Sequence, residues 1–168
     1  GSLVHEIHVD LGTVRPLQEK SQRGPAGGWT YSAWGPKGSE VFVSGQRFAA
    51  VTNGSQFLGS PQIWSVPAAE RPFAIQLPLT RYRLADIAQL HAVSPLPDGS
   101  GVVYSAVVVN GKGDRELYRV PNEGGTPVAL TSTPRDEFSP AVSPDGKQIA
   151  HVSNHLGNLD LFLMPAGV

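Results

Sequence analysis

Histidines are the residues of this chain that could bind a metal ion. His5 and His8 are three positions apart, which on a strand places their side chains on opposite faces. His151 and His155 flank the end of an expected strand, and no third ligand follows them at a suitable spacing. Because a protein zinc site needs three or four protein ligands, the sequence predicts neither a metal site nor a cofactor.

Serine is frequent, but its pattern does not indicate a nucleophile. No Gly-x-Ser-x-Gly motif occurs, and residues 54–59 have the wrong spacing for one. Most serines lie at the ends of repeated strands, where a hydroxyl group satisfies nearby backbone groups. The chain has no cysteine, which excludes thiol catalysis, disulfides and cysteine-ligated zinc. We therefore expect no catalytic residue here, and the sequence leaves open whether a longer parent protein is an enzyme.

Two acidic positions and one glycine-rich loop also have structural interpretations. Asp136-Glu137 and Asp160 precede expected strands, where carboxylates can accept hydrogen bonds from turn amides. Glycosidase chemistry would need two carboxylates on opposite sides of a cleft. The sequence does not indicate a cleft, so the structural interpretation of these acidic residues is favoured. Residues 111–114 are rich in glycine but lie between two strands, whereas a phosphate-binding loop opens a helix. The sequence favours a hairpin loop at this position.

The charge of the chain limits its partners. The formal net charge is −1, and the lysines and arginines form no block, so binding to nucleic acid is not expected. No apolar run approaches the roughly 18 residues of a membrane span. The start also lacks the layout of a signal peptide, and residues 1–2 (Gly-Ser) are typical of a tag remnant.

A repeat supplies the elements that would position any binding residue. Each copy is a short strand, a Pro-x-Gly turn and an apolar strand that ends in serine, in residues 31–44, 91–105 and 138–153. In the turn, proline presets the first corner and glycine supplies a positive φ. Two strands joined this tightly pair as a hairpin.

A second unit follows each hairpin. It is an apolar-aromatic strand stopped by proline, at residues 63–67, 117–121 and 161–165. A fourth short strand is expected at residues 73–77 and 127–130, and residues 6–9 pair with 14–17 in the same way. The turn glycines are 61 and 47 residues apart, and an insertion around residues 45–60 explains the longer interval. Four strands per repeat at about this period predict an all-β fold, a β-propeller.

The repeats divide the chain into about three four-stranded blades plus a partial blade. The expected domain is residues 3–168, made of an outer half-blade (3–17), two blades (30–77 and 89–130) and a truncated last blade (137–165). Propellers close with about four to eight blades, so this is part of a ring. Either the chain is a fragment, or two copies associate and the opening half-blade completes the last blade of the partner.

Residues 138–162 carry a family resemblance. The pattern Phe138-Ser-Pro, Ser143-Pro-Asp-Gly-Lys, Ile149-Ala, Ser153-Asn, Gly157-Asn and Asp160-Leu-Phe resembles the repeat of TolB-like β-propellers. The same repeat occurs in propeller domains of prolyl-oligopeptidase-type serine peptidases and beside some amidohydrolases. In the copy at residues 31–44, Lys37 replaces the usual aspartate. The resemblance implies a fold and a periplasmic or otherwise exported bacterial setting, with a cytoplasmic one not excluded. It implies no reaction.

The connections between hairpins suggest where binding occurs. The Pro-x-Gly turns are short and regular, whereas the connections on the other face of the disc are longer and irregular, which is typical of binding loops. The candidate binding residues there are Tyr82, Arg83, His91, Arg135, Asp136 and His155.

Three functions remain open from the sequence. The first is a non-catalytic scaffold that binds a protein or peptide through this face. The alternative is an accessory domain of a larger serine peptidase or amidohydrolase that gates or positions substrate. A third is a binder of a small ligand or carbohydrate through loop aromatics.

Overall fold

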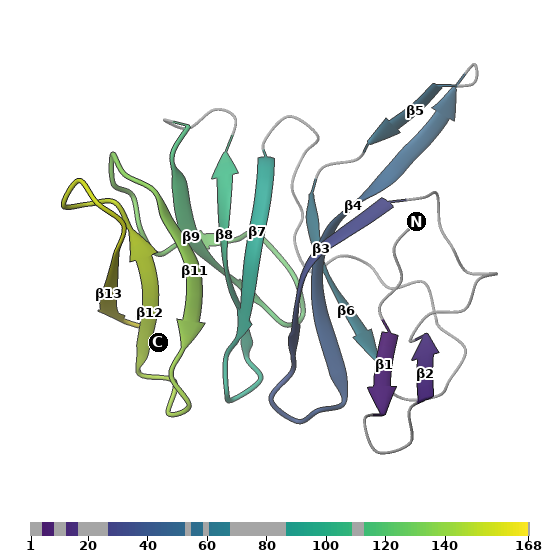
Figure 1. The fold of residues 1–168 in the computed structure, drawn as a ribbon, viewed down its shortest axis with the longest axis horizontal. Coiled ribbons are helices and arrows are strands. Elements are labelled where there is room, and N and C mark those ends of the chain that lie inside the picture. Colours follow the sequence, from purple (N-terminus) through teal and green to yellow (C-terminus); the bar gives the residue numbers. More distant parts are fainter. Residues whose placement is uncertain are drawn as a thin grey trace.

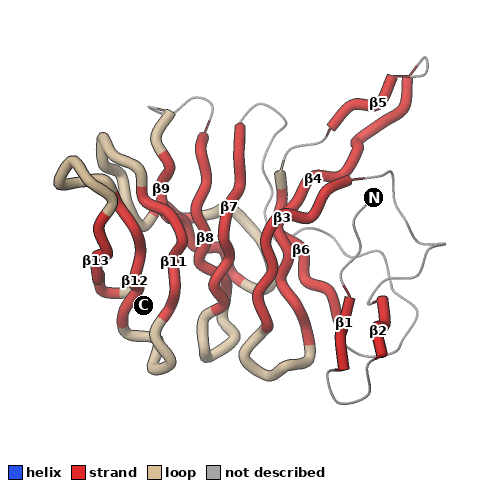
Figure 2. Tube along the Cα trace, viewed as in Figure 1, coloured by secondary structure: helices blue, strands red, loops and turns tan. Residues whose placement is uncertain are grey.

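The computed structural model describes residues 5–8, 13–16, 27–52, 55–58, 61–67, 87–108 and 113–167. These residues form thirteen antiparallel strands and no helix, as Figures 1 and 2 show. Within these ranges there is accordingly no helix long and apolar enough to cross a membrane.

Three sheets stand side by side as the blades of a partial propeller (Figure 1). Blade A contains β3 (Gly27–Trp34), β4 (Glu40–Thr52) and β6 (Gln62–Pro67). Blade B contains β7 (Ile87–Pro95), β8 (Gly101–Val108), β9 (Arg115–Pro121) and β10 (Val128–Ala129). Blade C contains β11 (Glu137–Val142), β12 (Gln148–Ser153) and β13 (Asp160–Pro165). The prediction of a partial all-β propeller is confirmed.

The opening hairpin forms as the repeat predicted, since β1 (His5–His8) pairs with β2 (Thr13–Pro16). The expected strand at residues 73–77 lies outside the described residues. The insertion expected around residues 45–60 is not an irregular connection. There β4 continues to Thr52 and pairs with β5 (Ser55–Leu58), and Figure 2 shows this pair extending away from the blades. The reason is local, because Asn53-Gly54 is a dipeptide that strongly favours a two-residue hairpin.

The Pro-x-Gly turns close each hairpin in the way the sequence predicted. Gly38, Gly99 and Gly146 have φ of 64°, 77° and 72°. In two turns an aspartate also accepts a backbone hydrogen bond, Asp98 Oδ1 from Ser100 N at 2.8 Å and Asp145 Oδ1 from Lys147 N at 3.0 Å. The corresponding residue in blade A is Lys37, whose side chain cannot accept such a hydrogen bond.

Each inner strand carries a bulge at a similar height. The register shifts between Trp29 and Tyr31 in β3, between His91 and Val93 in β7, and between Phe138 and Ala141 in β11. The third shift contains Ser139, whose φ is 53°. Bulges re-aim the side chains of a strand and often lie beside functional sites. These register shifts therefore change the direction in which the side chains of the inner strands point.

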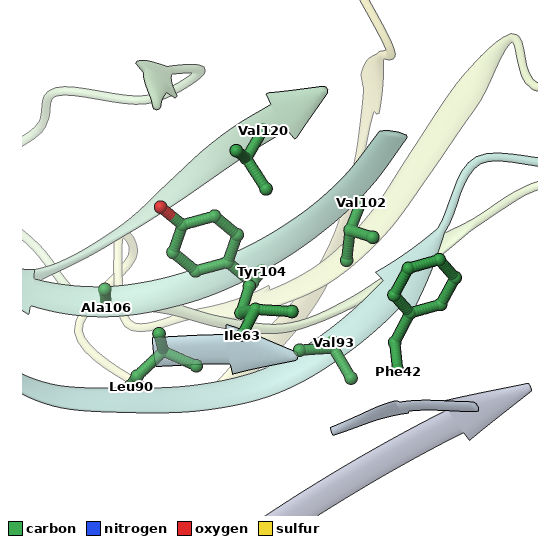
Figure 3. Close-up of a cluster of buried hydrophobic side chains, with 8 residues drawn as sticks. All are labelled: Phe42, Ile63, Leu90, Val93, Val102, Tyr104, Ala106 and Val120. Carbon is green, nitrogen blue, oxygen red and sulfur yellow. The ribbon is translucent and has the colours of Figure 1, made fainter. Parts of the chain in front are cut away.

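The core lies between the blades and not within a single sheet. Between blades A and B, eight buried side chains meet (Figure 3): Phe42, Ile63, Leu90, Val93, Val102, Tyr104, Ala106 and Val120. Between blades B and C the buried residues are Leu96, Val103, Leu117, Ile149 and Ala166. Alternate residues of a strand point to opposite faces, so the central strand β8 contributes Val102 and Tyr104 to one core and Val103 to the other. This packing fixes the inner strands relative to one another.

Candidate binding site on the inner strands

The first strands of the three blades form the inner wall of the fold. Strand β7 packs against β3 on one side and β11 on the other. In Figure 1 the Pro-x-Gly turns lie together at one end of these strands, and the connections that lead into β11 and from β12 to β13 lie at the other end. The side chains near this second end form the candidate binding site.

Three polar side chains link blades A and B across this wall. The hydroxyl of Tyr31 lies 3.3 Å from His91 Nδ1, and His91 Nε2 lies 3.1 Å from Gln89 Oε1. The rings of Tyr31 and His91 also meet edge to face, with centroids 5.8 Å apart. Because an amide oxygen only accepts, His91 carries its proton on Nε2 and accepts from Tyr31. Tyr31 remains 42% exposed, so its ring is available to a ligand.

The surroundings of His91 favour the neutral imidazole. Burial lowers the pKa of His91 below its usual 6.5, the positive charge of Arg115 lowers it further, and the negative charge of Asp136 partly opposes both effects. At neutral pH the ring is therefore uncharged. It acts here as a hydrogen-bonding group.

Asp136 holds the connection into β11 against both neighbouring elements. Its Oδ1 accepts a hydrogen bond from the backbone N–H of Arg115 at 2.9 Å, and its own N–H donates to Asn154 Oδ1 at 3.0 Å. The guanidinium of Arg115 lies over the ring of Phe138, 5.5 Å from its centroid, a distance typical of a cation–π contact. Asp136 therefore stabilises this connection through its hydrogen bonds. Its negative charge also raises the pKa of His91.

A partly buried carboxyl pair lies beneath this connection. Glu116 accepts hydrogen bonds from Thr131 Oγ1 at 2.6 Å and from Thr133 N at 2.7 Å. Glu137 Oε1 accepts from Thr133 Oγ1 at 2.8 Å and from Ser153 Oγ at 3.2 Å. These bonds tie residues 131–137 to both blades and make this loop rigid.

The surroundings of Glu116 favour its neutral, protonated form. Burial raises the pKa of Glu116, and hydrogen bonds from Thr131 and Thr133 oppose this, whereas a hydrogen bond with Glu137 adds to the rise. Glu137 is 3% exposed, and its Oε2 has no donor among the described N–H and O–H groups. The raised pKa means that Glu116 keeps its proton to a higher pH than an exposed glutamate does.

The structure brings only some of the sequence-predicted residues together. His91 and Asp136 act on each other electrostatically. His155 is exposed and contacts Phe162 edge to face at 6.3 Å, and Arg135 closes a tight turn with Thr133 through its backbone. Tyr82 and Arg83 lie outside the described residues.

Sequence reasoning missed Tyr31, Gln89, Arg115 and Phe138. A signal for Phe138 was present in the repeat, because Phe138 lies eight residues before its turn glycine, as the predicted His91 does. Residues at equal distances from the turn occupy equivalent heights on the inner strands. Tyr31 and Arg115 could not be found in this way, since they reach the site through packing between blades.

The chemistry of this site is hydrogen bonding and aromatic contact. In the part of the chain that the structure describes, no group of three His, Asp or Glu side chains is arranged to hold a metal ion. The site offers a tyrosine ring and hydroxyl, a neutral imidazole and an amide, which can recognise the polar backbone of a peptide or a comparable ligand.

Sequence comparisons find relatives over parts of the chain. No family model matches. Dipeptidyl-peptidase 5 of Porphyromonas gingivalis is 33% identical over 86 residues, which are 49% of this chain and 13% of that protein. A TolB homolog of Chlorobium luteolum is 34% identical over 62 residues, 37% of this chain and 14% of that protein. The matches therefore span about a seventh of the length of these relatives.

Structural comparisons cover nearly the whole chain. TolB from Acinetobacter baumannii matches 97% of it with a TM-score of 0.64 and 14% identity, over 35% of the TolB chain. A puromycin-hydrolysing peptidase of Mycobacterium tuberculosis matches 99% of it with a TM-score of 0.69 and 14% identity, over 26% of that chain. At such identities the likeness concerns the fold. By its fold this chain is a partial β-propeller, and its repeat and structure are similar to those of TolB and of peptidase propeller domains.

Proposed function

We propose that the chain is a non-catalytic propeller module that binds a peptide or an extended segment of a protein at the inner-strand site. The supporting observation is the Tyr31–His91–Gln89 group, in which an exposed tyrosine donates a hydrogen bond to His91 of the neighbouring blade, and His91 is itself held by Gln89. Tyrosine on a rigid support contributes contact area at a low cost in side-chain entropy. A peptide backbone supplies donors and acceptors that suit the adjoining polar groups.

A peptide library displayed against the chain tests this proposal, followed by titration of selected peptides by fluorescence polarisation. The variant Tyr31→Ala removes the exposed ring and is expected to weaken binding at least about tenfold, because aromatic anchors often contribute about 2 kcal/mol or more. The matched control is Lys147→Ala, an exposed position beside the turn at the other end of the fold. Binding that Lys147→Ala weakens and Tyr31→Ala leaves unchanged would place the ligand elsewhere and contradict the proposal.

A second candidate is an accessory domain in a longer hydrolase, where the same site would position substrate. The observation in its favour is the match to a dipeptidyl-peptidase, of which the aligned stretch is 13%. The sequence of the full-length gene distinguishes the independent module from the accessory domain. A hydrolase domain encoded beside these blades would favour the accessory role, and its absence would favour an independent module.

An exported bacterial setting belongs to the same proposal and is supported by the TolB-like resemblance. Cell fractionation of the native host with an antibody against the chain tests it. Recovery with the periplasmic fraction is the expected result, and recovery with the cytoplasmic fraction would contradict it.

A further inference from the structure

Arg115, the first residue of β9, brings a positive charge to the inner-strand site. Its guanidinium lies over the ring of Phe138, 5.5 Å from the ring centroid. Phe138 has on β11 the position that His91 has on β7, since each lies eight residues before its turn glycine. Because β7 and β11 pack against each other, the guanidinium lies beside the wall that carries His91 and Tyr31.

The charge of Arg115 has no counterion in the part of the chain that the structure describes. Its Nε is buried and has no hydrogen-bond partner among the described residues. The neighbouring carboxylate of Asp136 accepts instead from the backbone N–H of Arg115, at 2.9 Å. A half-buried cation has lost part of its hydration, and without a partner nothing replaces it. An anion that bound this guanidinium would supply the missing partner.

The charges around His91 make this part of the site positive. Arg115 lowers the pKa of His91 and Asp136 raises it, and the effect of Arg115 is the larger of the two. Burial also lowers the pKa of His91, so the imidazole adds no charge at neutral pH. Because the positive charge dominates, this part of the site attracts an anionic group and repels a cationic one.

The geometry of Arg115 suits a carboxylate. The planar guanidinium can bind the two oxygens of a carboxylate through parallel N–H···O bonds. The cation–π contact with Phe138 already holds the guanidinium in place, so little side-chain entropy is lost when a ligand binds. A peptide offers a carboxylate at its C terminus and on any aspartate or glutamate.

We propose that the inner-strand site selects peptides that carry a carboxylate, which binds the guanidinium of Arg115 while the rest of the peptide contacts Tyr31. This inference rests on the proposed function, because it specifies which peptides the site accepts. It assigns Arg115 as the residue that determines specificity. A C-terminal and a side-chain carboxylate present the same two oxygens, and the experiment distinguishes these two sources.

NMR titration of the chain with three N-acetylated tetra-alanine probes tests the proposal. The first probe has a free C-terminal carboxylate, the second a C-terminal amide, and the third is the amide with one alanine replaced by glutamate. The ring resonances of His91 and Phe138 report binding at constant pH. At least one carboxylate probe should bind about tenfold or more tightly than the neutral amide, because hydrogen bonds between charged groups are the strong ones. The tighter carboxylate probe identifies the source.

Arg115→Gln should abolish this preference, because glutamine has no positive charge and no guanidinium fork. The matched control is Arg119→Gln, which removes the same charge from the same strand. There the guanidinium donates to Ser100 Oγ at 3.2 Å, and the preference should remain unchanged. Circular dichroism verifies that both variants fold, and the comparison of the three probes on the native chain requires no variant.

The outcomes separate this inference from the proposed function. Equal binding of charged and neutral probes, weakened by Tyr31→Ala, would overturn the carboxylate preference and leave the peptide site supported. A carboxylate preference that depends on Arg115 but not on Tyr31 would support this inference and contradict the peptide site. Equal losses of preference in Arg115→Gln and Arg119→Gln would overturn the role of Arg115, and failure of all three probes to bind would contradict both proposals.

Discussion

The side chain of Pro97 in blade B lies against Gly146 in blade C, where a Cβ added to the glycine would be 3.8 Å from Pro97 Cδ. The same relationship holds one blade earlier, where Gly99 faces Pro36 at 3.9 Å. The turn proline of one blade thus covers the turn glycine of the next. The residues that shape each hairpin also help to stack the blades.

Gly146→Ala should destabilise the chain by about 1 kcal/mol, because φ is 72° at this position and an L side chain is strained there. A Cβ at 3.8 Å from Pro97 is an ordinary contact, so strain and not collision causes the loss. Urea unfolding measures it. Asparagine tolerates a positive φ better than alanine, so Gly146→Asn should be less destabilising than Gly146→Ala. An equal loss in both variants would show that the contact with Pro97 is the cause.

Gly101→Ala should be much more harmful, with a loss of about 2–3 kcal/mol. The added Cβ would lie 2.4 Å from the backbone oxygen of Val120 on the paired strand, and backbone atoms of a sheet cannot move away cheaply. The matched control is Gly35→Ala, where the nearest atom is Glu40 Cγ at 2.8 Å, part of a flexible side chain. The difference between the two variants in urea unfolding should be at least about 1 kcal/mol. Equal losses would mean that the β8–β9 pair adjusts as easily as a side chain.

The features that the sequence predicted correctly are local or repeated. The Pro-x-Gly turn depends on the backbone preferences of three neighbouring residues, and its recurrence at Gly38, Gly99 and Gly146 was enough to predict stacked hairpins. The hairpin of β4 and β5 also has a local signal, because Asn53-Gly54 favours a two-residue turn, although the spacing of the repeat alone indicates only an insertion there.

The features that the sequence could not predict depend on contacts between blades. Tyr31 and His91 are 60 positions apart and meet only because β3 and β7 pack side by side. Leu117 and Leu161 occupy the same position of the repeat, yet one is buried and the other exposed. Residue type and pattern are the same for both, so the sequence alone does not show which of the two leucines another blade covers.

Two substitutions near His91 should move its pKa in opposite directions. Arg115→Gln removes the positive charge that lowers the pKa, so the pKa should rise, whereas Asp136→Asn removes the negative charge that raises it, so the pKa should fall. Asparagine keeps an oxygen that can accept from the backbone N–H of residue 115. NMR titration of the imidazole resonances measures both changes. Shifts of the same sign would show that structural rearrangement, and not charge, controls His91.

The carboxyl pair should give the stability a distinctive pH dependence. The pKa of Glu116 is raised in the folded chain, so folding takes up a proton. The stabilisation from this group is then full below the unfolded pKa, about 4.3, and is lost as pH rises through the higher folded pKa.

Glu116→Gln should remove that dependence, because the amide is neutral at every pH. Relative to the native chain, the variant should gain stability between about pH 4 and pH 8 by roughly 0.5 kcal/mol, since Glu116 is only partly buried and solvent screens the effect. Urea unfolding at the two pH values measures the gain. Glu123→Gln removes the same charge from an exposed loop position and should show no such trend. If Glu116→Gln instead lost stability relative to the native chain as pH rose, the pKa of Glu116 would be lowered and not raised in the folded chain.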